Sequence, residues 1–274
     1  MRVLVLGSQG MLGSALVRHL ATGDFEVWGA TSGRGEAQSG VLLQDVDVTR
    51  PGDVDRALDA SRAEAVVNCA GVVKSECAAV GDERVAAVNA RAPHAVAELA
   101  ARRGARLVHV STDCVFSGRR GSYREDDSTD AEDLYGQSKA AGEVREPHVT
   151  LRTSFIGRDP RRQRGLLEWL LARGGETTVP GFTRAMWSGL SAVELARVVA
   201  FVLLAPSMSG LYHVAGPVTS KADLLEVLVR ELGLGCRVER VGGEVLDRTL
   251  DGSRFQQVTG YVPPSWAEMA RELA

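Results

Sequence analysis

The chain has 274 residues, of which 45% are hydrophobic and 24% are charged, and its formal net charge at pH 7 is -3. This length and composition exclude a fibrous or disordered chain and fit a globular protein with one domain and a smaller appended lobe. The weak negative charge provides no basic face for a nucleic acid or an anionic membrane, so we expect neither as a partner.

The cysteines and the apolar runs bear on metal binding and on location. The chain has four cysteines, Cys69, Cys77, Cys114 and Cys236. They form no Cys-x-x-Cys pair and have no nearby histidine at metal-ligand spacing, so we expect no metal site. No apolar run reaches the ~20 residues that cross a bilayer, and the opening segment enters a strand and a glycine loop without a signal peptide. We therefore expect a cytoplasmic protein.

From residue 1 to about residue 153, short β-branched runs alternate with alanine-rich helical segments. The predicted strands are residues 2–6, 26–30, 42–45, 65–69, 106–111 and 150–153. The helices between them are predicted to begin near Met11, Pro51, Glu83 and Leu134. This alternation is typical of an α/β fold with a doubly wound, parallel Rossmann sheet, whose ligand binds beyond the carboxyl ends of the strands.

After Phe155 the pattern is less regular, beginning with a stretch rich in Arg and Gly at 157–165. The predicted elements are a short helix at 166–172, a helix at 191–204, a strand at 210–216, a helix at 222–232 and a terminal helix after Pro264. The helix and strand in the middle resemble one more unit of the main sheet. We therefore predict a nucleotide-binding domain over 1–155, rejoined by 190–216, and a smaller interleaved C-terminal substrate lobe formed by 156–189 and 217–274.

Gly7, Gly10 and Gly13 form a GxxGxxG pattern directly after the first strand and directly before the first helix. Gly7 permits a sharp turn, Gly10 lets the backbone approach a pyrophosphate, and Gly13 allows the helix to pack closely on the sheet. The alternative is that these glycines only form a tight turn. The context favours a dinucleotide cofactor, bound by Gly7, Gln9, Gly10, Met11, Leu12 and Gly13.

The end of the second predicted strand indicates which dinucleotide binds. Sites for NAD usually carry Asp or Glu about 20 residues after the glycine loop, where it binds the ribose 2'-hydroxyl. Here the strand is followed by Thr31, Ser32, Gly33 and Arg34. Ser32 and Arg34 could bind the 2'-phosphate of NADP, Arg34 through a charge-assisted contact. NADP(H) is therefore preferred and NAD(H) stays open, with a solvated loop charge as the alternative role of Arg34.

Tyr135 and Lys139 stand four residues apart, which on a helix places them on the same face. A free tyrosine titrates near ~10. A nearby ammonium would favour the phenolate and bring the group toward working pH as a proton donor and acceptor. Such a pair also occurs by chance on a solvated helix face. The glycine loop, together with a strand ending in the hydroxyls of Ser111 and Thr112, favours the catalytic interpretation.

With these motifs, the sequence resembles the extended short-chain dehydrogenase/reductase family, in its dTDP-4-dehydrorhamnose reductase branch. The likeness is carried by the segments 111–118, 123–127, 135–143, 151–154 and 248–251. The resemblance implies that Thr112 binds the substrate carbonyl, Tyr135 protonates the new alkoxide and Lys139 holds the nicotinamide ribose. It implies a nucleotide-linked 4-keto-6-deoxy sugar as substrate, reduced at carbon 4. The implied further cofactor contacts are Asp47, Val48, Cys69, Ala70, Gly71 and Asn89.

The sequence departs from the family pattern at Cys114, where an aromatic residue is common, and across 181–189. Asp113 is followed by no second acid, so dehydration is disfavoured. The candidate substrate contacts are Lys74, Asp113, Cys114, Arg184, Trp187 and Arg248. Arginines can clamp a pyrophosphate and Trp187 could stack on a base or sugar, although Trp187 could equally be lobe core and Arg248 a surface ion-pair partner. A non-catalytic NADP-binding regulatory subunit and a sugar-nucleotide epimerase stay open as alternatives, and the chain could form a homodimer.

Overall fold

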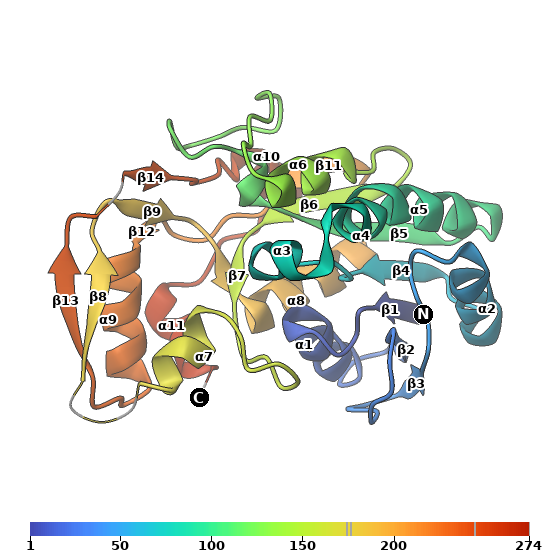
Figure 1. The fold of residues 1–274 in the computed structure, drawn as a ribbon. Coiled ribbons are helices and arrows are strands. Elements are labelled where there is room, and N and C mark those ends of the chain that lie inside the picture. Colours follow the sequence, from blue (N-terminus) through green and yellow to red (C-terminus); the bar gives the residue numbers. More distant parts are fainter. Residues whose placement is uncertain (174, 176, 244, 274) are drawn as a thin grey trace.

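A computed structural model describes residues 1–173, 175, 177–243 and 245–273, and its centre is a seven-stranded parallel sheet (Figure 1). In spatial order the strands are β11 (Gly210–His213), β6 (Val149–Thr153), β5 (Arg106–Thr112), β4 (Ala65–Asn68), β1 (Arg2–Leu6), β2 (Glu26–Ala30) and β3 (Val41–Leu43). The order reverses between β1 and β4, which is the switch point at which doubly wound sheets bind ligands.

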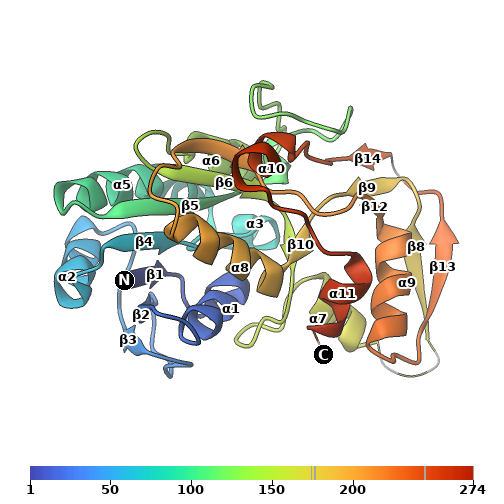
Figure 2. The same ribbon diagram turned by 180° about the vertical axis from the view of Figure 1, so that it is seen from behind.

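Helices cover both faces of this sheet (Figures 1 and 2). One face carries α1 (Met11–Leu20) and α8 (Ala192–Leu203), and the other carries α2 (Pro51–Ser61), α4 (Asp82–Ala86), α5 (Ala92–Arg102) and α6 (Leu134–Ala141). Because both faces are covered, the central strands are continuous apolar runs, and Val3 to Leu6 of β1 are 0% exposed. Within the described residues, no helix has the length and apolar character needed to cross a membrane.

Short helical segments follow the carboxyl ends of β4 and β5, on the side where a ligand is expected. They are η1 (Lys74–Glu76), α3 (Cys77–Val80), η2 (Ala87–Arg91) and η3 (Asp113–Val115). η2 continues directly into α5, and η3 lies between β5 and the loop that leads to α6. These segments form the walls around the sheet's ligand-binding edge.

The later part of the chain builds a smaller lobe beside the sheet (Figure 1). Apart from α8 and β11, the elements in this part of the chain are β7 (Phe155–Ile156), α7 (Leu166–Leu171), β8 (Thr178–Phe182), β9 (Ala185–Trp187), β10 (Leu190–Ser191), β12 (Thr219–Ser220), α9 (Lys221–Glu231), β13 (Arg237–Val241), β14 (Leu246–Asp247), α10 (Ser253–Thr259) and α11 (Trp266–Arg271). β8 pairs with β13, and β9 pairs with both β12 and β14. The predicted Rossmann sheet with an interleaved C-terminal lobe is confirmed; the exact domain bounds stay a prediction.

The predicted bounds are most accurate in the sheet. β3 ends at Leu43 because Asp45 has a φ of 55°, in the left-handed region, which turns the chain. β8 is not among the predicted strands, since Pro180 and Gly181 are poor strand formers. α10 is also unpredicted. It packs on β11, where the rings of Tyr212 and Phe255 lie 6.1 Å apart, so part of segment 217–274 covers the sheet rather than the lobe.

Candidate active site

The loop between β1 and α1 has the geometry of a phosphate-binding turn. Gly7 has a φ of 76°, which favours glycine. A Cβ on Gly13 would lie 2.1 Å from the Gly7 carbonyl oxygen, so α1 can approach the strand only with glycine there. A Cβ on Gly10 would meet only that same oxygen, at 3.5 Å. Packing within the described chain therefore does not require glycine at position 10, and the backbone there is open to a ligand.

The amino end of α1 offers free hydrogen-bond donors beside this turn. Among the described residues, the backbone amides of Met11, Leu12 and Gly13 have no acceptor, and the helix has no side-chain cap. Amide donors at the amino end of a helix favour a phosphate. The Gln9 amide group donates to the Glu36 carbonyl at 3.1 Å and ties the turn to the loop after β2. The turn thus fits the pyrophosphate of a dinucleotide.

Cations without a competing carboxylate lie at the end of β2. Ser32 and Arg34 are exposed, and their side chains form no hydrogen bond with a described residue. A third group arrives from the loop after β7, because Arg161 NH1 is 3.4 Å from Thr31 Oγ1. Arg161 NH2 also lies 3.2 Å from the place of a Cβ on Gly33. The sequence prediction missed Arg161, since no local motif links it to β2.

The other predicted cofactor residues follow β3 and β4. Cys69, Ala70 and Gly71 lie at the carboxyl end of β4 and are partly or fully exposed, so they are accessible to a ligand. Val48 is buried. The Asp47 carboxylate lies 3.0 Å from the guanidinium of Arg84, and the backbone of its segment is held near β2. Their contact with a cofactor stays a prediction.

Asn89, another predicted cofactor residue, is hydrogen-bonded within the protein. It is 1% exposed, and its Oδ1 accepts a hydrogen bond from the Val72 amide at 2.8 Å. Its Nδ2 donates to the Val72 carbonyl at 2.9 Å and to Ser138 Oγ at 3.2 Å. The whole amide group therefore binds the protein. Asn89 positions the loop after β4 against α6, and its contact with a cofactor stays a prediction.

Tyr135 and Lys139 lie on α6, as their spacing predicts, and the first turn of the helix sets their position. Asp133 caps the helix by accepting a hydrogen bond from the Gly136 amide at 2.8 Å. A Cβ on Gly136 would lie 2.1 Å from the Cys114 carbonyl oxygen, so glycine lets α6 sit against the segment that follows β5. This close approach brings the Tyr135 phenol to the end of β5.

Thr112 is the last residue of β5, and its hydroxyl group is held in a fixed position. The Cys114 amide donates to Thr112 Oγ1 at 3.1 Å, and Oγ1 in turn donates to Asp113 Oδ1 at 3.2 Å. Thr112 is 8% exposed and Asp113 is 4% exposed. Burial raises the pKa of Asp113, and the nearby cations Lys221 and Arg248 oppose this rise.

Burial also sets the acid–base properties of the predicted catalytic pair. It raises the pKa of Tyr135 above its usual value, and the Thr112 hydroxyl opposes this in part. It lowers the pKa of Lys139 to about 8, and the Glu143 carboxylate opposes this. The Lys139 ammonium donates to the Val110 carbonyl at 2.8 Å. For Tyr135 the effect of burial is the largest one, and the lowering of its pKa by Lys139 stays a prediction.

A buried ion pair lies behind these residues. Arg152 and Glu143 have side chains that are 2% and 5% exposed, and they form two hydrogen bonds of 2.6 and 2.7 Å. Ser111 Oγ donates to the same carboxylate at 2.8 Å. Paired hydrogen bonds of this kind fix both side chains. The pair joins β5, β6 and the segment after α6, so it supports the position of α6, the helix that carries Lys139.

Two predicted substrate residues lie at the edge of this site. The Lys74 ammonium is 2.7 Å from the carboxylate of Asp133, the residue that caps α6. Arg248 Nε donates to the Phe116 carbonyl at 2.9 Å, just beyond η3. Arg248 therefore stands beside the segment of Asp113 and Cys114, where the sequence places the sugar, and Lys74 stands beside the start of α6.

The other two predicted substrate residues are differently placed. Arg184 is exposed in the turn between β8 and β9, and its side chain forms no hydrogen bond with a described residue. Trp187 is 4% exposed and stacks on Trp266, with ring centroids 5.1 Å apart. Its ring packs in the lobe core, which was the alternative role, and its stacking on a base or sugar stays a prediction. Lys221, which the sequence analysis missed, lies over this ring.

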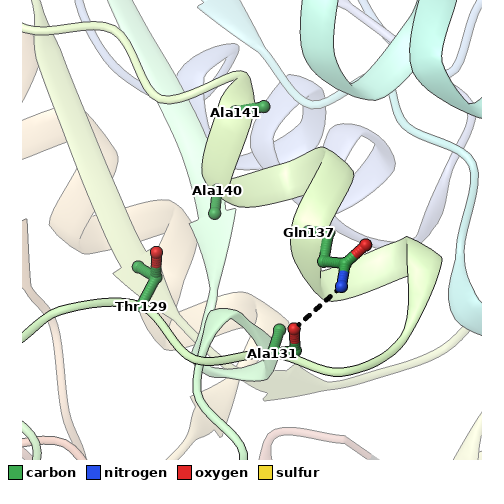
Figure 3. Close-up of a pocket in the computed structure, with 5 residues that line it drawn as sticks. All are labelled: Thr129, Ala131, Gln137, Ala140 and Ala141. Carbon is green, nitrogen blue, oxygen red and sulfur yellow. Dashed lines mark hydrogen bonds between the residues drawn. The ribbon is translucent and has the colours of Figure 1, made fainter.

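A separate pocket of about 350 Å³ lies on another side of α6 (Figure 3). It is lined by Thr129, Ala131, Gln137, Ala140 and Ala141. The Gln137 amide group donates to the Ala131 carbonyl across its edge, at 3.1 Å. None of the predicted catalytic residues lines this pocket. In the part of the chain that the structure describes, no three His, Cys, Asp or Glu residues are arranged to hold a metal ion.

The family described as the RmlD substrate binding domain matches residues 1–273. The chain belongs to this family. The RmlD match runs through both the sheet and the lobe, and it confirms the predicted resemblance to the dTDP-4-dehydrorhamnose reductase branch of the extended short-chain dehydrogenases/reductases. The chain is accordingly an NAD(P)-dependent oxidoreductase.

Relatives of this RmlD family member include named reductases. A "Probable dTDP-4,6-dihydroxy-2-methyloxan-3-one 4-ketoreductase" of Streptomyces antibioticus is 36% identical over 223 residues, covering 78% of this chain and 70% of the relative. A dTDP-4-dehydrorhamnose reductase of Streptomyces griseus is 30% identical over 230 residues, covering 77% and 69%. A solved dTDP-4-dehydrorhamnose reductase of Bacillus anthracis, in complex with NADP, has a TM-score of 0.83 at 21% identity and covers 99% and 98%. This last likeness concerns the fold.

Proposed function

We propose that the protein reduces the 4-keto group of a nucleotide-linked 6-deoxy sugar, with NADPH as the preferred cofactor and Tyr135 as the proton donor. The observation that carries the proposal is that the Thr112 hydroxyl, fixed by the Cys114 amide at the end of β5, lies beside the Tyr135 phenol. This edge of the sheet also carries the phosphate-binding turn. The named reductases among the relatives, which act on dTDP-linked sugars by name, support the substrate class.

Thr112 and Tyr135 would divide the work on the carbonyl. The Cys114 amide fixes Thr112 Oγ1, whose proton can turn from Asp113 to the oxygen of a substrate carbonyl. The raised pKa of Tyr135 keeps a proton on the phenol oxygen until an alkoxide forms beside it. That proton then passes to the alkoxide, which Thr112 stabilises by a hydrogen bond. Bound NADPH supplies the hydride.

The cofactor would be held by groups along one edge of the sheet. The turn at Gly10 and the free amides of α1 suit the pyrophosphate. Lys139, whose ammonium donates to the Val110 carbonyl, would also donate to the nicotinamide ribose. Ser32, Arg34 and Arg161 suit a 2'-phosphate, because guanidinium groups bind phosphate oxygens through charge-assisted hydrogen bonds. A preference for NADPH over NADH follows from these groups. The same proposal includes a cytoplasmic location and a homodimer.

The direct test is to incubate the purified protein with NADPH and dTDP-4-keto-6-deoxyglucose. We expect one NADPH to be consumed for each sugar reduced, with deuterium from labelled NADPH appearing at carbon 4 of the product. An epimerase would return an isomer of the sugar without net NADPH loss. A regulatory subunit would bind NADPH and leave both compounds unchanged. Either of these two results would overturn the proposal.

A further inference from the structure

One segment connects parts of the proposed cofactor site that lie far apart in sequence. It is the segment 157–165 between β7 and α7, which we call the arginine loop because four of its nine residues are arginine. Figures 1 and 2 show it beside α1. A Cβ on Gly157 would lie 3.4 Å from Met11 Cγ, and a Cβ on Gly165 would lie 3.0 Å from Met11 Cε. Both ends of the arginine loop therefore lie on the first residue of α1, beside the glycine turn.

Between its ends, the arginine loop reaches both sides of this turn. On one side, Arg161 contacts Thr31 after β2 at 3.4 Å. On the other side, Arg162 Nη1 donates to Glu76 Oε1 at 2.5 Å, and Arg164 Nη1 donates to the same oxygen. Glu76 belongs to η1, which follows β4. Because β2 and β4 flank β1 in the sheet, the loop spans the edge at which the turn would hold the pyrophosphate.

The arginine loop has a defined shape of its own. The Asp159 side chain accepts hydrogen bonds from the Arg161 amide at 3.3 Å and from the Arg162 amide at 3.0 Å. The Asp159 amide donates to the Glu168 carboxylate of α7 at 2.9 Å, and Asp159 is 8% exposed. These bonds lie within the loop and α7, so they do not depend on the sheet. The contacts with Thr31 and Glu76 therefore decide how closely the loop lies against the sheet edge.

The charges favour a contact that can open. The Glu76 side chain is 14% exposed, whereas those of Arg162 and Arg164 are 52% and 53% exposed. Among the described residues, Glu76 is the one carboxylate within 4.0 Å of either guanidinium, so two cations share one anion. Ion pairs that are open to solvent are individually weak. Positive charge also remains in excess here, which suits a place beside an anionic dinucleotide.

We propose that the arginine loop closes over the bound dinucleotide, that Glu76 holds it closed through Arg162 and Arg164, and that the opening of these ion pairs sets the rate of cofactor release. A dinucleotide held by the glycine turn would leave only after one side of the loop has moved. Glu76 is a positioning residue, since it acts through the two arginines. This inference rests on the cofactor site of the proposed function and adds a control on its occupancy.

The first test needs no cofactor. Trypsin cleaves after arginine, and it reaches a segment in proportion to the population of its open form when opening is fast. In Glu76→Gln we expect cleavage after Arg162 and Arg164 to be about 10-fold faster than in wild type, the scale of two exposed ion pairs. Mass spectrometry of the first fragments identifies the sites. Glu83→Gln, which breaks an exposed pair with Arg91, is the control and should leave these rates unchanged.

The second test measures the dissociation rate of NADPH from its fluorescence after rapid mixing with excess NADP. Glu76→Gln should release NADPH about 10-fold faster than wild type. The double variant Arg162→Gln/Arg164→Gln should show the same increase, and adding Glu76→Gln to it should have no further effect, because all three changes break the same pairs. The KM for NADPH should rise in Glu76→Gln without a fall in kcat, whereas general damage to the fold would lower kcat.

The outcomes separate this inference from the reductase function. Unchanged trypsin cleavage and NADPH release in Glu76→Gln would overturn the inference and leave the function intact. Tighter NADPH binding in Glu76→Gln would also overturn it, because the freed arginines would then bind the cofactor themselves. If Glu76→Gln does not fold, the double arginine variant decides through its release rate, since both arginines are exposed. Failure of wild type to bind NADPH would overturn both the inference and the proposed function.

Discussion

The sheet side and the lobe side of the site are built in different ways. On the sheet side, Gly7, Gly10 and Gly13 lie within one short loop. The backbone conformation requires glycine at position 7 and close packing requires it at position 13, whereas the backbone at Gly10 leaves room for a phosphate. On the lobe side, Arg248 comes from a distant segment and reaches the edge of the site through its hydrogen bond to the Phe116 carbonyl. The comparison teaches that cofactor binding is encoded locally, whereas sugar recognition depends on contacts between distant parts of the chain.

The two sides also treat buried charge differently. Behind the catalytic residues, the charges of Arg152 and Glu143 are paired with one another through two hydrogen bonds. In the lobe, the Lys221 ammonium has no such partner among the described residues and lies over the Trp187 ring. A paired buried charge stabilises the fold of its surroundings, and an unpaired one is available to a ligand. Substitutions on the two sides should therefore have different consequences.

The largest effect is expected for Tyr135→Phe, which removes the proton donor and keeps the ring. We expect kcat to fall by about 1,000-fold, because positioned acids contribute this order of acceleration, with little change in the Tm. Tyr261→Phe is the matched control, since its hydroxyl binds Glu194 at 3.1 Å, away from α6. Steady-state kinetics with NADPH and the keto-sugar measure both variants. Full turnover by Tyr135→Phe would contradict the proposed mechanism.

Glu143→Gln tests the paired charge. Removing one partner leaves Arg152 buried without its counter-ion, so we expect a loss of about 3–5 kcal/mol in the free energy of unfolding. Glu98→Gln breaks a surface pair with Arg102 at 3.5 Å and should cost less than about 1 kcal/mol. Denaturant titration of both variants gives the comparison. If both variants lost a similarly small free energy of unfolding, the buried pair would not be needed to support α6.

Arg161→Ala tests a predicted cofactor contact that comes from a segment distant in sequence from the glycine turn. Arg161 reaches Thr31 from a loop 130 residues further along the chain. Losing its contact with a 2'-phosphate should raise the KM for NADPH by about 10-fold and leave the KM for NADH unchanged. Arg158→Ala, whose guanidinium is paired with Glu168 at 3.0 Å, is the control. An equal change in the KM for NADPH and for NADH would exclude a contact between Arg161 and the 2'-phosphate.

Elements of the fold could be predicted from the sequence where burial is complete. β1 and β2 lie at their predicted residues 2–6 and 26–30, because parallel strands covered on both faces must be continuous apolar runs. α6 begins at Leu134 as predicted. β8 and α10 could not be predicted, since Pro180 and Gly181 hide the strand and α10 depends on its contact with β11. Pairing with distant elements outweighs local propensity there.

The site shows the same limit. The glycine turn and the helical spacing of Tyr135 and Lys139 are local backbone properties, so the sequence by itself determined their placement. The packing of Trp187 on Trp266, the hydrogen bonds of Asn89 and the positions of Arg161 and Lys221 were decided only by the tertiary structure. A single side chain carries no periodicity, and its contacts come from residues far along the chain. The sequence thus determined a nucleotide-binding reductase fold, and tertiary packing decided which side chains face the sugar.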